Sequence, residues 1–203
     1  MRTLLVLLFF TPMALAKSNH FSCSNLKHNF TGSEIIEVKK QLANNDGAPV
    51  IPSKVTLAVS IGDLDYIKKH RSFEVLAEAL EVTLSSDLSL FNDLLALLED
   101  SDINKQGEGK PTLLMVAADC GQTQAVTKLL SLGADINQGI ATSGINPLNQ
   151  AVMNRNTVMV RHLLANGAAC HRATLVNGKS VFDLAKNQGN KEVSLLLDRC
   201  LIK

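Results

Sequence analysis

A repeat of 34 residues runs through the second half of the chain and constrains its fold more than any other feature. Three phrases of similar pattern begin at Thr112, Asn146 and Ser180, which are spaced 34 residues apart. A fixed period of about 20–50 residues is typical of stacked units, each of which packs against its neighbours. Such stacks form binding surfaces far more often than active sites. The period therefore predicts a scaffold that binds something through its surface.

Each phrase is followed by a second helical pattern. Apolar residues at i, i+3 and i+4 lie on one face of a short helix. The same triplet occurs in two units, at Val126, Leu129 and Leu130 and again at Val160, Leu163 and Leu164. Small residues at Ala117, Ala151 and Ala185 allow paired helices to approach closely. Gly133 and Gly167 suit the left-handed residue that ends a helix.

This pattern resembles the ankyrin repeat, whose unit is a β-turn followed by two antiparallel helices with a signature near TPLHxAA…G…VVxxLLxxGADVN. Similar copies run over Gly109–Asn137, Gly144–His171 and Gly178–Ile202. Asp198 and Arg199 fall where a continuing repeat stays apolar or neutral, as expected of a capping unit. The resemblance implies a helical solenoid that binds proteins.

The chain also departs from the family pattern. The histidine of TPLH is replaced by Met115, Asn149 and Asp183, so its usual hydrogen bond inside the turn is absent or remade. The stop before the last unit reads Ala169-Cys170-His171 in place of Asp-Val-Asn. These departures leave the stacking pattern intact.

Weaker copies lie upstream. Leu94–Asn104 resembles the second helix and stop of a unit whose first helix lies in Phe73–Leu84, and Val55–Lys69 resembles an earlier helix pair. Thr31-Gly32-Ser33-Glu34 is a capping box that predicts a helix to about Ala43. The predicted fold class is therefore all-α, a solenoid of about four or five helix-turn-helix units behind an N-terminal capping helix. The expected divisions are a signal peptide at 1–16, an arm and capping helix at 17–52, degenerate repeats at 53–108 and three clear repeats at 109–203.

The first 16 residues predict export. Arg2 precedes a short apolar run, Leu4–Phe10, and Ala14-Leu15-Ala16 matches a small-x-small cleavage site. The run is shorter than the roughly 20 residues that span a bilayer. We expect a periplasmic protein, with secretion as the alternative and no membrane span after cleavage.

Composition argues against nucleic acid as a partner. The basic and acidic residues nearly balance at a formal net charge of +1, tryptophan is absent and Tyr66 is the only tyrosine. A basic patch and aromatic stacking platforms are therefore not expected. We expect a monomer that binds another protein, with no cofactor.

The cysteines and histidines yield no predicted catalytic or metal site. His20, Cys23 and His28 lack an evident fourth ligand, so we interpret them as a solvated arm. Adjacent residues on an extended segment point to opposite sides, which argues against Cys170 and His171 as a nucleophile and its base. Four cysteines allow three pairings. Cys170 and Cys200 belong to consecutive units and form the candidate disulfide, with buried free thiols as the alternative, while Cys23 and Cys120 stay unassigned.

The predicted partner-binding surface combines turn tips with the faces of the first helices in a concave groove. Apolar residues in polar loops can anchor a partner, although each can also fold back on its own repeat. The candidate residues are Ile140, Thr142, Asn149, Met153, Asn154, Arg172, Leu175 and Asn187. Two functions compete with a general binding module: a periplasmic inhibitor or immunity-type protein that neutralises a toxin or enzyme, and an enzyme with a site in the N-terminal half.

Overall fold

The computed structural model describes residues 36, 52–86, 88–172, 175 and 177–201. The chain divides into two compact units, residues 1–97 and 98–203, and each is described by itself. The predicted signal peptide and the predicted N-terminal capping helix lie outside the described residues, apart from Ile36, which is helical.

Unit 1 consists of two helix pairs in its described part. They are α3 (Pro52–Ser60) with α4 (Leu64–Lys69), and α5 (Phe73–Ser86) with α6 (Leu88–Leu95). Helix α5 packs against both α3 and α6. The core between them is apolar and includes the fully buried side chains of Ile67, Leu80, Leu84, Phe91 and Leu94. Helix pairs therefore occupy both upstream segments, but α6 lies earlier than expected: it ends at Leu95, before Leu97 and Leu98.

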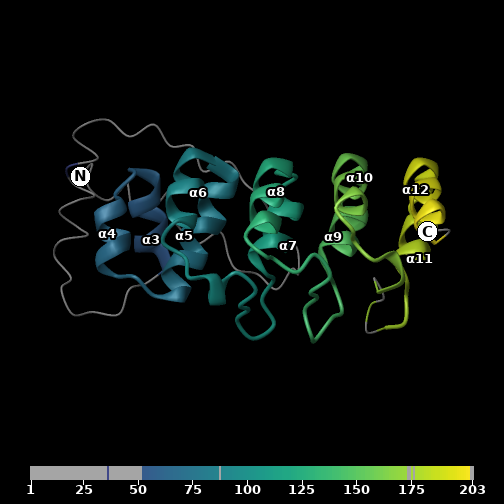
Figure 1. Cartoon of the computed structure of the whole chain (residues 1–203), viewed down its shortest axis with the longest axis horizontal. Coiled ribbons are helices and arrows are strands. Elements are labelled where there is room, and N and C mark those ends of the chain that lie inside the picture. Colours follow the sequence, from purple (N-terminus) through teal and green to yellow (C-terminus); the bar gives the residue numbers. More distant parts are fainter. Residues whose placement is uncertain (1–35, 37–51, 87, 173–174, 176, 202–203) are drawn as a thin grey trace, which may run out of the picture. The chain divides into compact units, whose positions relative to one another are not determined.

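Unit 2 consists of three helix pairs in its described part (Figure 1). They are α7 (Leu113–Asp119) with α8 (Thr123–Ser131), α9 (Pro147–Met153) with α10 (Thr157–Ala165), and α11 (Val181–Asn187) with α12 (Lys191–Leu201). Two 3-10 turns, η1 (Asp100–Asp102) and η2 (Cys170–Arg172), lie in the connecting segments. The first helices pack in a row, since α9 contacts both α7 and α11. The predicted all-α solenoid is confirmed.

Small buried residues and buried leucines explain why these helices pair. Ala117, Ala151 and Ala185 are each 0% exposed, so the helix axes can approach closely at all three equivalent positions. Leu129 and Leu163 are also fully buried between helices. Burial of a leucine side chain stabilises a fold by about 1.5–3 kcal/mol. The 34-residue period therefore repeats one packing arrangement.

In α9 and α11, the third helical residue takes over part of the family's missing histidine bond. The Asn149 Oδ1 accepts a hydrogen bond from the Asn146 backbone N–H at 3.1 Å, and the Asp183 Oδ2 accepts one from Ser180 at 2.8 Å. In return, the Asn146 and Ser180 side chains accept from the N–H groups of Asn149 and Asp183. These are reciprocal capping boxes. The bond is therefore remade in two units, whereas Met115 is buried and has no such oxygen.

The last described repeat of unit 2, α11 with α12, has polar residues where the earlier repeats have apolar ones. Val152 of α9 is fully buried, and its equivalent in α11, Lys186, is exposed. Leu164 of α10 is half-buried, and its equivalent in α12, Asp198, is exposed. The corresponding face of the last described repeat is therefore polar.

Candidate protein-binding surface

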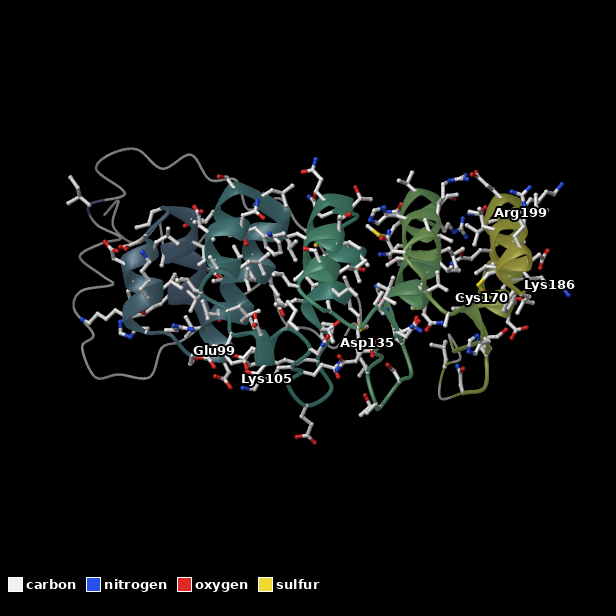
Figure 2. The ribbon with its side chains drawn as sticks, viewed as in Figure 1. Glu99, Lys105, Asp135, Cys170, Lys186 and Arg199 are labelled. Carbon is white, nitrogen blue, oxygen red and sulfur yellow. A yellow bond between two sulfur atoms is a disulfide. The ribbon has the colours of Figure 1, made fainter. Side chains whose placement is uncertain are left out.

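The loops that precede the three helix pairs of unit 2 extend from one side of the row, and we call them the tips (Figure 1). Their described parts cover residues 103–111, 138–145 and 175–179, the last with a gap at 176. Figure 2 shows Lys105 and Asp135 on this side of the unit. Each tip follows a short segment that comes after the preceding second helix, and we call this segment the stop. Hydrogen bonds made by the stops therefore fix where each tip begins.

Asn104 holds the first stop against the second. Its Nδ2 donates to the Gly133 carbonyl at 3.0 Å, and its Oδ1 accepts from the Asp135 backbone N–H at 2.7 Å. Gln138 adds a bond from its Nε2 to the Asn104 carbonyl at 2.9 Å. These contacts also explain why unit 2 begins at residue 98 and not at 109: the preceding stop is bonded to the repeats that follow it.

Asn137 repeats the role of Asn104 one repeat later along the chain. Its Oδ1 accepts from the Ala169 backbone N–H at 2.8 Å. The equivalent residue of the following unit is His171, which is exposed and lies in η2. Successive tips are thus positioned by side-chain amides that bridge neighbouring units.

The second tip is a short hairpin. The Ile140 N–H donates to the Ile145 carbonyl at 2.8 Å, and the Gly144 N–H donates to the Ile140 carbonyl at 2.7 Å. Ile140 is half-buried, so part of its side chain packs on its own repeat, while Thr142 is exposed at the turn. Thr142 is therefore the more accessible of the two predicted contact residues.

The third tip is described only in part. The Leu175 N–H donates to the Lys179 carbonyl at 2.9 Å, and the Leu175 side chain is half-buried. Arg172 belongs to η2, but its side chain lies outside the described set, as do residues 173–174 and 176. The prediction that Arg172 and Leu175 contact a partner stays a prediction.

One predicted contact residue on the first helices is wrong. Asn149 is 0% exposed because its side chain closes the capping box of α9, so it is not available to a partner. Met153 is half-buried, and its carbonyl accepts from the Gln188 Nε2 at 3.1 Å. Asn154 and Asn187 are exposed.

Asn154 belongs to a polar network between neighbouring repeats of unit 2. Its Nδ2 donates to the Asp119 Oδ1 at 2.6 Å, and the same carboxylate oxygen accepts from the Gln150 Nε2. The Asp119 charge is thereby used inside the scaffold. Asn154 therefore has a structural role, which the sequence pattern did not reveal.

A disulfide joins Cys170 of η2 to Cys200 of α12, with Cα atoms 6.3 Å apart (Figure 2). Cys170 is 3% exposed. A buried sulfur in a disulfide is not a nucleophile, so the pair Cys170–His171 has no catalytic arrangement here. Cys120 is also disulfide-bonded. The predicted arm residues His20, Cys23 and His28 lie outside the described residues.

Among the residues that the structure describes, no three or more His, Cys, Asp or Glu side chains lie together in a group that could hold a metal ion. The hollow in unit 1 lined by Val59, Ile67 and Leu94 has no interior space for a water molecule. Among the described helices, none combines the length and apolar character that crossing a bilayer requires.

Sequence reasoning missed the residue at the turn between α9 and α10. Arg155 has a φ of 56°, in the left-handed region, where it is the only non-glycine residue of the described chain. Its equivalents in the neighbouring units are Gly121 and Gly189, at the same 34-residue spacing. A comparison of these three positions in the sequence would have revealed the exception.

Comparison with known proteins agrees with the architecture. A family model described as ankyrin repeats (3 copies) matches residues 80–174. The chain is 36% identical over 96 residues to a mitochondrial disaggregase of Bos taurus and 34% identical over 85 residues to BRCA1-associated RING domain protein 1 of Caenorhabditis elegans. It is 40% identical over 78 residues to a B-cell lymphoma 3 protein homolog of Mus musculus.

These similarities cover only part of each protein. They span 47%, 42% and 38% of this chain, and 14%, 12% and 17% of the three relatives in the same order. Together with the stacked helix pairs, the family match shows that residues 80–174 contain ankyrin repeats. Ankyrin repeats are protein–protein interaction modules, and their presence supports a protein-binding role.

Proposed function

We propose that this chain is an exported protein that binds one or more protein partners through the tips and first-helix faces of unit 2. The observation that carries the proposal is that Asn104 and Asn137 bridge the neighbouring segments from which successive tips begin. A loop anchored where it begins loses less conformational entropy when it binds, and preorganisation of this kind raises affinity. The exposed Thr142 turn belongs to such a held loop.

The Cys170–Cys200 disulfide supports the extracytoplasmic part of the proposal. Disulfides form and persist in oxidising compartments and are rare in reducing ones. The bond joins two consecutive repeats of unit 2, which already has an apolar core. Export, periplasmic or into the medium, is consistent with this chemistry and with the predicted signal peptide.

Site-specific photo-crosslinking in living cells tests the proposal. A photoreactive amino acid replaces Thr142 in the tip, and the matched control replaces Gln124, which is exposed on α8. We expect a light-dependent protein adduct from position 142 in the extracytoplasmic fraction and little adduct from position 124. Equal labelling from both positions would argue against the tips as the binding surface, and an adduct confined to the cytoplasm would argue against export.

The same experiment separates a general module from an inhibitor. A single adduct that purifies as a one-to-one complex favours the inhibitor or immunity-type function. Several adducts of different mass favour a module that binds more than one protein.

A further inference from the structure

The turns between the first and second helices form one edge of unit 2, which we call the turn edge. It comprises residues 119–123, 154–157 and 188–191. Neighbouring turns are in contact: Asn154 donates to Asp119 at 2.6 Å, and the Asn190 Nδ2 lies 3.4 Å from the Thr157 Oγ1. The turn edge is therefore a continuous strip of three turns.

All three turns close with the same backbone hydrogen bonds. At the middle turn the Arg155 N–H donates to the Val152 carbonyl at 2.9 Å, and the Asn156 N–H donates to the Ala151 carbonyl at 3.0 Å. The first turn has the equivalent pair from Gly121 and Gln122. This is the Schellman arrangement, which requires a left-handed residue just after the helix and most often uses glycine. The fold requires the backbone conformation but not an arginine.

An arginine at this position is unfavourable for the backbone. A side chain with a Cβ is disfavoured at positive φ, and the exceptions that proteins tolerate best are asparagine and aspartate. Gly121 and Gly189, with φ values of 70° and 66°, adopt the same conformation without the steric strain that a Cβ causes. Strained residues of this kind persist where the surrounding structure determines them, and they gather at functional sites.

Among the described residues, the Arg155 side chain makes no contact that offsets this backbone strain. It is exposed, and it has no side-chain hydrogen bond or ion pair with any described residue. The remaining charges of the turn edge are Asp119 and Lys191. The Asp119 carboxylate already accepts from Gln150 and Asn154, while Lys191 is exposed. The charges that the turn edge offers to solvent are thus positive.

We propose that the turn edge is a second contact surface, on which Arg155, supported by Lys191, binds a carboxylate of a protein partner. The guanidinium group can hold a carboxylate with two parallel hydrogen bonds, which a lysine cannot do. This inference rests on the proposed protein-binding function and adds the chemistry of the group that is recognised: an aspartate- or glutamate-rich segment.

Peptide selection on the full oxidised chain tests the inference. A random-peptide library displayed on phage is panned on the wild-type protein, and selected peptides are synthesised and titrated by fluorescence anisotropy. We expect peptides rich in aspartate and glutamate that bind Arg155→Gly at least about tenfold more weakly, since a hydrogen-bonded charge pair is lost. Arg155→Lys should recover part of the affinity.

Two controls separate binding from folding. Lys128→Ala removes an exposed positive charge from α8 and should leave the affinity unchanged. Arg155→Gly should also raise the melting temperature by about 2–4 °C, because glycine relieves the backbone. A variant that is more stable but binds less well cannot be explained by partial unfolding.

The inference is overturned if the selected peptides lack acidic residues, or if acidic peptides bind Arg155→Gly as tightly as they bind the wild type. Binding of a random RNA oligonucleotide is measured in parallel. If RNA is the only ligand whose binding is lost in Arg155→Gly, the inference is overturned as well. An unchanged or lower melting temperature for Arg155→Gly would also remove its premise. Adducts from Thr142 without any Arg155-dependent peptide would overturn this inference and leave the proposed function standing. The absence of both adducts and peptides would remove both.

Discussion

At the scale of the residue, the third positions of α9 and α11 show how the chain replaces a missing histidine. Asn149 and Asp183 both accept a hydrogen bond from the backbone N–H three residues earlier. Asp183 differs because its carboxylate is ionised and exposed. Hydrogen bonds from the Ser180 hydroxyl and from the Ser180 backbone lower the pKa of Asp183 below its ordinary value of 3.8, while desolvation opposes them.

This shift predicts a specific dependence of stability on pH. A folded-state pKa below the unfolded value means that Asp183 stabilises the fold above about pH 4, and that this stabilisation is lost as pH falls through the lowered pKa. Asp183→Asn removes the titration and can keep the capping box, as Asn149 does. Urea unfolding followed by circular dichroism should therefore show a weaker acid dependence in Asp183→Asn than in wild type. Parallel curves between about pH 5 and pH 2 would contradict the assignment.

Residue roles were harder to predict than residue positions. The 34-residue period placed Asn149 correctly in its helix, yet it gave no sign that the side chain turns inward to bond with Asn146. Asn154 is exposed, and its predicted contact with a partner stays a prediction, but the period did not reveal that it donates to Asp119 of the preceding repeat. A period reports which residues are equivalent, whereas hydrogen bonds between units depend on three-dimensional distances.

At the scale of the element, α12 differs from the other second helices because a covalent bond holds it. It contacts α10, α11 and η2, and Cys200 ties it to Cys170 across a separation of 30 residues. Its buried face is reduced to Val193 and Leu197. A loop of this length restricts the unfolded chain considerably when it is closed by a disulfide. We therefore expect α12 to depend on this bond more than any other helix of unit 2 does.

Removal of the disulfide tests this dependence. Cys200→Ser should lower the free energy of unfolding of unit 2 by about 2–4 kcal/mol, and amide hydrogen exchange should accelerate most in α12. Cys120→Ser serves as the control and should leave exchange in α12 close to wild type. Unchanged protection of α12 in Cys200→Ser would show that apolar packing alone holds the helix.

Most helices could be predicted from local patterns. Apolar residues at i, i+3 and i+4 predicted the second helices, and the stops at Gly133 and Gly167 have the left-handed φ values of 90° and 91° that the pattern required. Cysteine pairing could not be derived in the same way, because a disulfide needs Cα atoms within about 7 Å. The structure brings Cys170 and Cys200 to 6.3 Å.

At the scale of the whole molecule, unit 2 combines a repeated core with two surfaces that the core does not use. The tips are held by Asn104 and Asn137, and the turn edge carries Arg155 at a position where the neighbouring units have glycine. Stacked units contact mainly their neighbours, so a change on either surface should leave the rest of the stack intact. Binding and folding can therefore be altered separately in this molecule.

The fold class followed from the repeat, while the partner did not. Stacking depends on a few apolar positions per unit, such as Leu129 and Leu163, which any sequence-level comparison reveals. Recognition depends on exposed groups such as Thr142 and Arg155, whose meaning depends on the other protein. For that reason the account is tested best on a complex.

Hydrogen exchange of the full chain, measured with and without the protein captured from position 142, tests the central claim most directly. The account predicts slower exchange at residues 138–145 in the second tip and at residues 154–157 in the turn edge, with α8 and residues 158–165 of α10 unchanged. Slower exchange confined to α8, α10 and α12, or no change anywhere in unit 2, would contradict it.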